Sequence, residues 1–502
     1  MEVLGYEFQI SSTWVLIMML LVLIIYLYCT WGHSTFAKMG VPGPKPIPLF
    51  GNILDLIGGK TPLHIIHKQM IEKYGKIVGL YEGRTPILLV TDRDMMQEIM
   101  VKKFANFHNR RKFPLDNGIL DQGVNNLTDE HWKEIRNVLS PSFSAGKLKK
   151  MSPLLNACCD SLVENILQKE AAKQSIEVME LFGAYVIDSV ASCGFGLDVN
   201  CQKNKDHPFQ NHCKKAFDVS FSSFSIASAI LLPWTARILN LFQIPITPKE
   251  TITYFSNITD QVINLRRREE SAKRIDFMQL MIDSDNSALS KRAQLTNTEI
   301  LAQSLTFFFA GYETTTTALC YIAYLLARNG DKQEKLIQEI DDVTEGKSDI
   351  GYEVVAKMPY LEMVVTESIR MYSPATIYDR VCTESCTVKG IHIPKGMIIV
   401  FPAYAIHHDP ELYPEPDSFK PERFSKEKKQ QRHPFAFATF GNGPRNCIGM
   451  RFALIEIKMA IVRILQKVKF EVCAETEIPP TPRKNGFLTP ANDLYLRVVA
   501  RN

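Results

Sequence analysis

One cysteine of this 502-residue chain lies in a segment that could do chemistry. Residues 440–449 have the sequence Phe-Gly-Asn-Gly-Pro-Arg-Asn-Cys-Ile-Gly, which predicts a tight loop around Cys447. Helical spacing begins at Met450, so backbone NH groups and a helix dipole should stabilise a thiolate and lower its pKa. Arg445, two residues away, adds positive charge. A thiolate in this setting serves as a nucleophile, a redox sensor or a metal ligand.

The neighbouring residues favour one of these uses. A nucleophilic cysteine needs a histidine base, and His433 is remote in sequence. A zinc site needs a second cysteine or histidine at short spacing, and Cys473 is too far along the chain. A single thiolate fits a metal that needs one protein ligand, as haem iron does. A buried, inert cysteine is the alternative.

The same loop carries a family resemblance. Phe440, Gly443, Arg445, Cys447 and Gly449 match the F-x-x-G-x-R-x-C-x-G signature of the cytochrome P-450 superfamily of haem-thiolate monooxygenases. The resemblance implies a mainly α fold with small β-sheets and haem b between a long central helix and the cysteine loop. It implies Cys447 as the axial ligand of the haem iron. It further implies haem contacts from Arg110, Trp132, Arg136, Arg380, Phe440, Gly441 and Arg445.

A second segment lies inside a long helical pattern. Residues 310–315 (Ala-Gly-Tyr-Glu-Thr-Thr) place a glycine and threonines in an otherwise apolar stretch, and a threonine hydroxyl can bond back to the preceding turn and open the helix locally. Threonine packing at a helix crossing is the alternative. The segment resembles the superfamily's oxygen-binding groove, which implies that Thr314 bonds dioxygen and Glu313 relays protons.

Two further motifs predict a structural network. Glu367 and Arg370 are three residues apart, on one helix face. An ordinary surface pair is the alternative. The pair resembles the superfamily's E-x-x-R motif, and Arg423, in Pro-Glu-Arg-Phe, resembles its third member. We expect this network to act in folding and cofactor retention, not in chemistry.

The elements that must position these residues are mostly helical. A capping box at residues 296–299 begins a helix that should run to Arg328, about 48 Å long and buried on most faces. Residues 74–94 predict a β-hairpin, and residues 380–404 predict a second β region.

The N-terminus predicts a membrane anchor. Residues 14–28 are apolar and uncharged, aromatic residues lie at both ends, and basic residues follow. A cleaved signal peptide is the alternative. No other stretch is expected to span a membrane. We expect a lumenal tip and anchor (1–31), a stiff proline-rich hinge (32–50) and a cytosolic haem-thiolate domain (51–502).

Composition excludes several classes. The 58 basic and 54 acidic residues give a net charge of +4, which is too mild to indicate a nucleic-acid partner. Eleven scattered cysteines, an odd number, predict reduced thiols rather than a disulfide framework.

The chain is most similar to microsomal family 3, subfamily A, which implies the endoplasmic reticulum membrane and large lipophilic substrates such as steroids and drugs. It implies a pocket lined by Phe113, Phe309 and Ala375, under a roof at 212–245 that carries Phe217, Phe221 and Phe224. Without a dinucleotide-binding motif, electrons from NADPH must come from a partner, NADPH–cytochrome P-450 reductase, with cytochrome b5 as a second partner. We expect docking on a basic face: Lys133, Lys147, Lys149, Lys150, Arg451 and Lys458.

Two other functions stay open. A relative, thromboxane synthase, isomerises a lipid endoperoxide, but its branch lacks the groove threonine that this chain has at position 314. A non-catalytic, haem-containing lipid binder is the other alternative.

Overall fold

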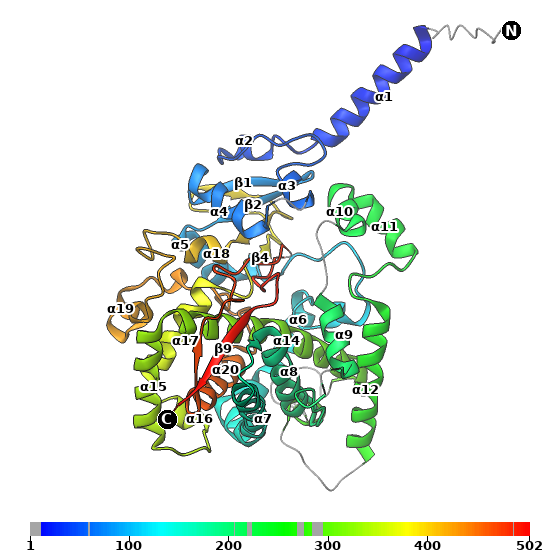
Figure 1. Ribbon diagram of the computed structural model, residues 1–502. Coiled ribbons are helices and arrows are strands. Elements are labelled where there is room, and N and C mark those ends of the chain that lie inside the picture. Colours follow the sequence, from blue (N-terminus) through cyan, green and yellow to red (C-terminus); the bar gives the residue numbers. More distant parts are fainter. Residues whose placement is uncertain are drawn as a thin grey trace, which may run out of the picture.

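A computed structural model describes residues 12–58, 61–204, 206–217, 223–268, 276–283, 295–484 and 486–501. Phe221 of the expected roof lies outside these residues. The body of the protein is mainly helical with small sheets, and one helix projects from it (Figure 1).

The central element is α14 (Asn297–Arg328), as the sequence predicts. Thr296 accepts a hydrogen bond from the NH of Glu299, and the Glu299 carboxylate accepts one from the NH of Thr296, so both halves of the capping box are present. The helix stays α-helical over its whole length, so the local opening expected at residues 310–315 does not interrupt it. It packs against α8, α12, α17 and α20 and forms the middle of the largest hydrophobic core.

The remaining helices surround α14. In the N-terminal half they are α1 (Ser12–Thr30), α2 (Thr35–Met39), α3 (Leu54–Ile57), α4 (Leu63–Tyr74), α5 (Arg93–Gln97), α6 (Asp129–Leu139), α7 (Ala145–Ala171), α8 (Val178–Val190), α9 (Pro208–Phe217), α10 (Phe224–Leu231), α11 (Pro233–Leu241), α12 (Lys249–Arg268) and α13 (Phe277–Ile282). After α14 they are α15 (Gly330–Thr344), α16 (Tyr352–Val355), α17 (Pro359–Met371), α18 (Ala403–His407), α19 (Lys426–Gln431) and α20 (Met450–Leu465).

The strands form three small sheets. They are β1 (Ile77–Glu82), β2 (Thr85–Val90), β3 (Ile176–Glu177), β4 (Tyr378–Val381), β5 (Cys386–Val388), β6 (Ile391–Ile393), β7 (Ile398–Phe401), β8 (Val468–Glu471) and β9 (Tyr495–Ala500). The orders are β1-β2-β7-β4, β3-β9-β8 and β5-β6. Both predicted β regions are confirmed: β1 and β2 form the hairpin, and β4 to β7 occupy the second region.

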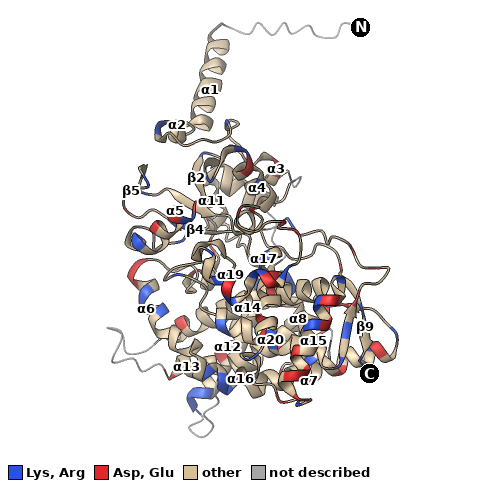
Figure 2. Ribbon diagram, turned by 90° about the vertical axis from the view of Figure 1, so that its left-hand side faces the viewer, with Lys and Arg blue, Asp and Glu red and all other residues tan. Residues whose placement is uncertain are grey.

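The projecting helix is α1, which carries no charged residue (Figure 2). Its side chains are apolar and mostly exposed. Its length and composition suit a membrane span, with 6% of the tested window buried. Residues Val178–Phe195 also pass this test, which corrects the expectation that no other stretch would. They are 83% buried and pack against α14, so they belong to the protein core.

The segment after α1 does not stand apart from the body. Residues 32–50 were expected as a stiff spacer, but the NH of Gly79 in β1 donates to Pro42 O at 2.8 Å. A Cβ atom on Gly43 would lie 2.1 Å from Gly79 O, so the proline-rich chain passes directly over the strand. The C-terminal end of α1, which we call its foot, is also held. The Arg84 guanidinium at the hairpin tip donates to Tyr28 O at 3.2 Å and lies over the Tyr28 ring.

Candidate functional site

The cysteine loop is closed by its own backbone. The NH of Cys447 donates to Phe440 O at 2.8 Å, and the NH of Asn446 donates to Gly443 O at 3.1 Å. Gly441 and Gly443 have φ angles of 68° and 75°. A Cβ atom on Gly443 would lie 2.3 Å from Met100 O, so the close approach to that backbone requires glycine. The loop leads directly into α20, as predicted.

Many protein atoms surround the Cys447 thiol, although part of the residue is accessible to solvent. Burial raises the pKa of the thiol, although the NH groups of Gly449 and Met450 and the nearby Arg110 and Arg136 act in the opposite direction. The side chain is nevertheless exposed. The predicted lowering of the thiol pKa is wrong for the chain alone, because loss of water around the sulfur outweighs the NH groups and cations.

Four arginines lie near this loop: Arg380 and Arg445 are buried, and Arg110 and Arg136 are half-buried. Burial, reinforced by Arg110, lowers the pKa of Arg380 to about 10 and that of Arg445 to about 9. Among the described residues, the buried Nε atoms of Arg110, Arg380 and Arg445 have no hydrogen-bond partner. Buried cations that repel one another and keep unused donors fit an anionic ligand with carboxylate groups.

Arg445 differs from the sequence expectation in what its side chain contacts. Arg445 donates to His108 O at 2.6 Å and to Leu127 O, and lies 4.6 Å from the centre of the Trp132 ring. Its guanidinium is therefore not the cation beside the thiol, a place that Arg110 and Arg136 take. Trp132 is buried on α6, one turn before Arg136, whose guanidinium donates to Asn446 Oδ1 at 3.1 Å.

Arg110 and its neighbour Arg111 have separate partners. Arg110 donates to Arg445 O at 3.3 Å and to the side chain of Asn125. Arg111 pairs with Glu82 at 2.8 Å and with Asp379 at 3.0 Å. Of the two, only Arg110 is left with an unpartnered buried Nε atom among the described residues, so it is the one suited to an added anion.

The central helix presents one open stripe near residue 310. Ala310 is exposed, and Gly311 and Thr314 are half-buried, although most of α14 is buried. Residues 310 and 314 are one turn apart and share a face of the helix. The Thr314 hydroxyl donates to Ala310 O at 2.7 Å, the back-bond expected from the sequence.

Glu313 does not join Thr314 in this stripe. It is buried, and its Oε1 accepts a 2.6 Å hydrogen bond from the hydroxyl of Thr489, near the C-terminus. Burial raises the pKa of Glu313, while the Thr489 bond and the charge of Arg483 lower it in part. The carboxyl is therefore held between α14 and the C-terminal loop that carries Thr489.

Comparison with known proteins places these features in a family. The model of the cytochrome P450 family matches residues 41–498. The chain belongs to the cytochrome P450 family. It is 40% identical to cytochrome P450 3A29 of Sus scrofa over 98% of this chain and 97% of that protein. It is 41% identical to cytochrome P450 3A9 of Rattus norvegicus and 39% identical to lithocholate 6-beta-hydroxylase of Mesocricetus auratus, with the same coverage.

Membership supports a haem-thiolate monooxygenase that acts on lipophilic substrates, with a redox partner that supplies electrons. The residues present fit a haem. Cys447 is an exposed cysteine just before the start of a helix, and among the described residues Arg110, Arg380 and Arg445 each keep an unused buried Nε donor that a haem propionate could accept from.

The E-x-x-R residues form one buried group with Arg423. Arg370 Nε and Nη2 donate to the two oxygens of Glu367 at 2.7 and 2.9 Å, and Arg423 Nε donates to Glu367 Oε1 at 3.2 Å. Arg370 also donates to His407 O and Pro416 O. The group thus fastens α17 to the segment that leads to the cysteine loop.

The expected pocket residues lie in different surroundings. Phe309 packs against Phe217 with ring centres 6.2 Å apart, and Phe217 lies equally far from Phe487. Ala375 pairs with Phe487 through a β-bridge. Phe113 is 46% exposed, and its ring is 6.0 Å from the Arg111 guanidinium.

A buried carboxyl that sequence reasoning missed lies on α20. Glu456 has no exposed surface, and burial raises its pKa to about 8. Ser189 on α8 donates its hydroxyl to Glu456, and Tyr185 donates to Glu456 O at 3.2 Å. The sequence signal was a single acidic residue on the apolar face of a helix. Thr489 gave no signal, since its partner is 176 positions away.

The expected basic face is partly neutralised by ion pairs. Lys133 pairs with Glu130, Lys149 with Glu353, and Lys458 with Glu362. Lys150 and Arg451 are exposed, and Lys147 is half-buried.

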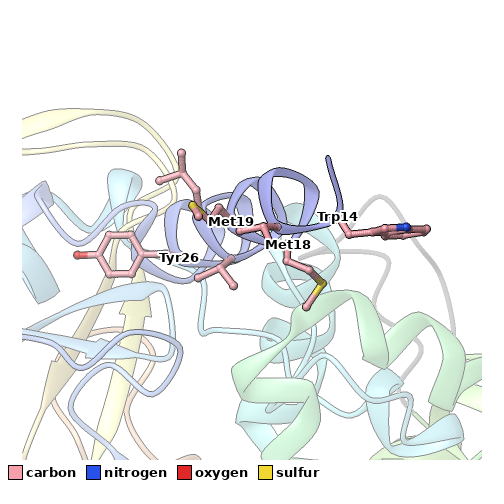
Figure 3. Close-up of a pocket in the computed structure, with 7 residues that line it drawn as sticks. Trp14, Met18, Met19 and Tyr26 are labelled. Carbon is pink, nitrogen blue, oxygen red and sulfur yellow. The ribbon is translucent and has the colours of Figure 1, made fainter. Parts of the chain in front are cut away.

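A groove along α1 lies away from this site. It is lined by Trp14, Met18, Met19 and Tyr26, among others, all from the helix itself (Figure 3). We interpret it as the outer surface of a single apolar helix, because no other element contributes to its lining.

Proposed function

We propose that the protein is an NADPH- and O2-dependent haem-thiolate monooxygenase that hydroxylates or dealkylates large lipophilic molecules, including steroids, drugs and other xenobiotics. One observation carries the proposal. Cys447 is an exposed cysteine near four arginines, three of which keep an unused buried Nε donor among the described residues, and α20 after it packs against the central helix. Haem b would lie between the cysteine loop and the open stripe of α14.

Each residue has a separate task in binding the haem. Cys447 would supply the thiolate that holds the haem iron, and its thiol would be deprotonated in that state, as a coordinating thiol is. Arg110, Arg136, Arg380 and Arg445 would neutralise the propionates, with Trp132 supporting Arg445. Phe440 and Gly441 would shape the loop. The bound haem supplies the activation of oxygen, which thiolate ligation favours.

Proton delivery falls to the central helix. The Thr314 hydroxyl would exchange its bond to Ala310 O for one to a ligand bound at the open stripe of α14, since an i−4 back-bond is easily replaced. Glu313 would supply protons from its buried position. Its pKa is raised by burial, so it holds a proton more readily than an exposed carboxyl.

Electrons would arrive from NADPH–cytochrome P-450 reductase on the face that carries Lys150 and Arg451, with cytochrome b5 as a second partner. Attraction between this face and an acidic partner should weaken at high salt. The ion pairs of Lys133, Lys149 and Lys458 reduce the charge available for this contact.

The membrane proposal rests on two apolar surfaces at one end of the body. The tip of the β1–β2 hairpin contacts both the foot of α1 and the end of α10, because Arg84 bonds Tyr28 and a Cβ on Gly83 would lie 3.1 Å from Ile230 O. Trp234, Leu241 and Phe242, on and just after α11, are 51%, 79% and 71% exposed. Figure 1 shows α10 and α11 toward the end from which α1 projects. We place the protein in the endoplasmic reticulum membrane with the body in the cytosol.

The deciding experiment uses labelled oxygen. The full-length protein is reconstituted with reductase, NADPH and oxygen-18 gas and given a panel of steroids and large lipophilic drugs. Products with one labelled oxygen atom support the proposal. Product formation from a lipid endoperoxide without NADPH would favour the isomerase, and substrate-induced spectral shifts without any product would favour a lipid binder.

A further inference from the structure

Glu313 and two threonines form a buried chain of hydrogen bonds. Glu313 and Thr317 lie one turn apart on α14 and share one side of the helix. Thr489 lies between them, with its hydroxyl 2.6 Å from Glu313 Oε1 and 3.0 Å from the hydroxyl of Thr317. All three side chains are buried. The carboxyl therefore has a fixed polar neighbour that does not belong to the central helix.

The loop that carries Thr489 is held in place by its backbone. Leu488 donates to Pro374 O at 3.1 Å, and Arg483 donates to Thr489 O at 2.7 Å. Pro482 and Pro490 form a β-bridge across the loop. These bonds fix the Thr489 hydroxyl at the carboxyl, so its contact with Glu313 is a built feature and not a chance approach of a surface side chain.

The chemistry of hydroxyl groups gives this chain a useful property. A hydroxyl donates one hydrogen bond and can accept two. When Glu313 is ionised, Thr317 donates to Thr489 and Thr489 donates to the carboxylate. When Glu313 is protonated, the carboxyl donates to Thr489 and Thr489 donates to Thr317. The chain thus satisfies both protonation states by turning two hydroxyl groups, with no movement of heavy atoms.

We propose that Thr489 is a positioning residue that allows Glu313 to take up and release a proton while the carboxyl stays buried, with Thr317 as the outer member of the chain. The inference rests on the proposed function, in which Glu313 relays protons. Without Thr489, the ionised carboxylate would lose a buried donor, and an unsatisfied buried charge is costly. The protonated form would then persist to higher pH and release its proton less readily.

The other titratable groups that interact with Glu313 are the same in every variant of the test. Arg483 lowers the pKa of Glu313, and Glu313 in turn raises the pKa values of Tyr312 and Cys320. None of these groups is changed in the variants below, so a difference between variants reports the hydroxyl chain.

The test compares T489V, which removes the hydroxyl at nearly constant shape, with T489S, which keeps it. T481V is the matched control, since Thr481 lies in the same loop and its hydroxyl bonds the half-buried Glu477. Infrared difference spectra, recorded on photolysis of the carbon monoxide complex across a pH series, follow the protonated carboxyl, which E313Q assigns. We expect the carboxyl of T489V to titrate about one pH unit higher than in the wild type. T489S and T481V should match the wild type.

Turnover gives a second measurement. In T489V, product formed per NADPH should fall severalfold and hydrogen peroxide should rise, with KM little changed. A wild-type titration and wild-type coupling in T489V would overturn the inference. If E313Q itself keeps normal coupling, the relay role of Glu313 fails, while the infrared titration still tests Thr489. If T489V does not fold, T317V decides, since it interrupts the same chain and should shift the titration in the same direction.

Discussion

Arg370 and Glu367 form a two-point ion pair with no exposed surface on either side chain. Nε and Nη2 of the guanidinium lie 2.7 and 2.9 Å from the two carboxylate oxygens. Arg423 and backbone groups of the segment before the cysteine loop make further hydrogen bonds to the pair. The pair is therefore bonded on both sides within the protein, so its removal should affect folding rather than chemistry.

The first prediction concerns this pair. E367A should lower the stability of the body by about 3–5 kcal/mol, because it leaves two buried guanidinium groups unpaired. The measurement is the denaturant midpoint and the yield of protein that retains haem. E345Q breaks the exposed pair of Glu345 with Lys347 and should change nothing. A stable, haem-loaded E367A protein would contradict a structural role.

A second prediction concerns the iron ligand. C447A should abolish the thiolate-type Soret band of the reduced carbon monoxide complex, while far-ultraviolet circular dichroism still reports a folded protein. C473A removes a half-buried cysteine of another segment and should keep the band. Persistence of the band in C447A would exclude Cys447 as the ligand.

Thr314 gives a third prediction. T314A should reduce product formed per NADPH severalfold and raise hydrogen peroxide, because a hydroxyl for proton delivery is lost. T306A is the matched control, since Thr306 makes the same 2.7 Å back-bond to Ala302 two turns earlier. An isomerase would be indifferent to T314A, so unchanged turnover and coupling would support that alternative.

The fourth prediction is a pH dependence caused by Glu456. Its folded-state pKa of about 8 lies above the ordinary value of 4.5, so between these values the folded state binds more protons than the unfolded state. The contribution of Glu456 to stability is therefore fully present below about pH 4.5 and is lost as pH rises through about 8. E456Q should flatten the stability profile in this window by on the order of a few kcal/mol. Parallel profiles for wild type and E456Q, measured by denaturant unfolding, would show that the carboxyl does not titrate there.

Membrane contact by the body gives the fifth prediction. A protein that lacks residues 1–31 should still bind vesicles, because the apolar surface that includes Trp234, Leu241 and Phe242 remains. Adding L241E and F242E should reduce this binding severalfold in a flotation assay, since two charges would enter the interface. L265E changes an exposed leucine of α12 and serves as the control. Equal vesicle binding by the protein with L241E and F242E and by the protein with L265E would show that the membrane contact of the body lies elsewhere.

Local sequence signals predicted much of this structure. The capping box at Thr296 and the glycines of the cysteine loop specify backbone geometry within a few residues, and both features are present as expected. The β1–β2 hairpin depends on a two-residue turn and is also confirmed.

Features that depend on distant residues were not predictable in this way. The pKa of Cys447 rises because burial, set by the whole fold, exceeds the effect of the neighbouring NH groups. Arg445 is two residues from the cysteine in sequence, but its guanidinium bonds the backbone of residues 108 and 127. Thr489 meets Glu313 only because the C-terminal loop returns to the central helix.

The fixed foot of α1 has a mechanical consequence. Arg84 bonds Tyr28, and Leu49 donates to Cys29 O at 3.3 Å, so the body cannot swivel freely about its helix. With α1 in a bilayer, any tilt of the helix would be passed to the whole body. A helix of 19 residues is about 28 Å long, and spans adjust their tilt to the thickness of the lipid. Lipid thickness would then set which flank of the enzyme is turned toward a neighbouring electron donor.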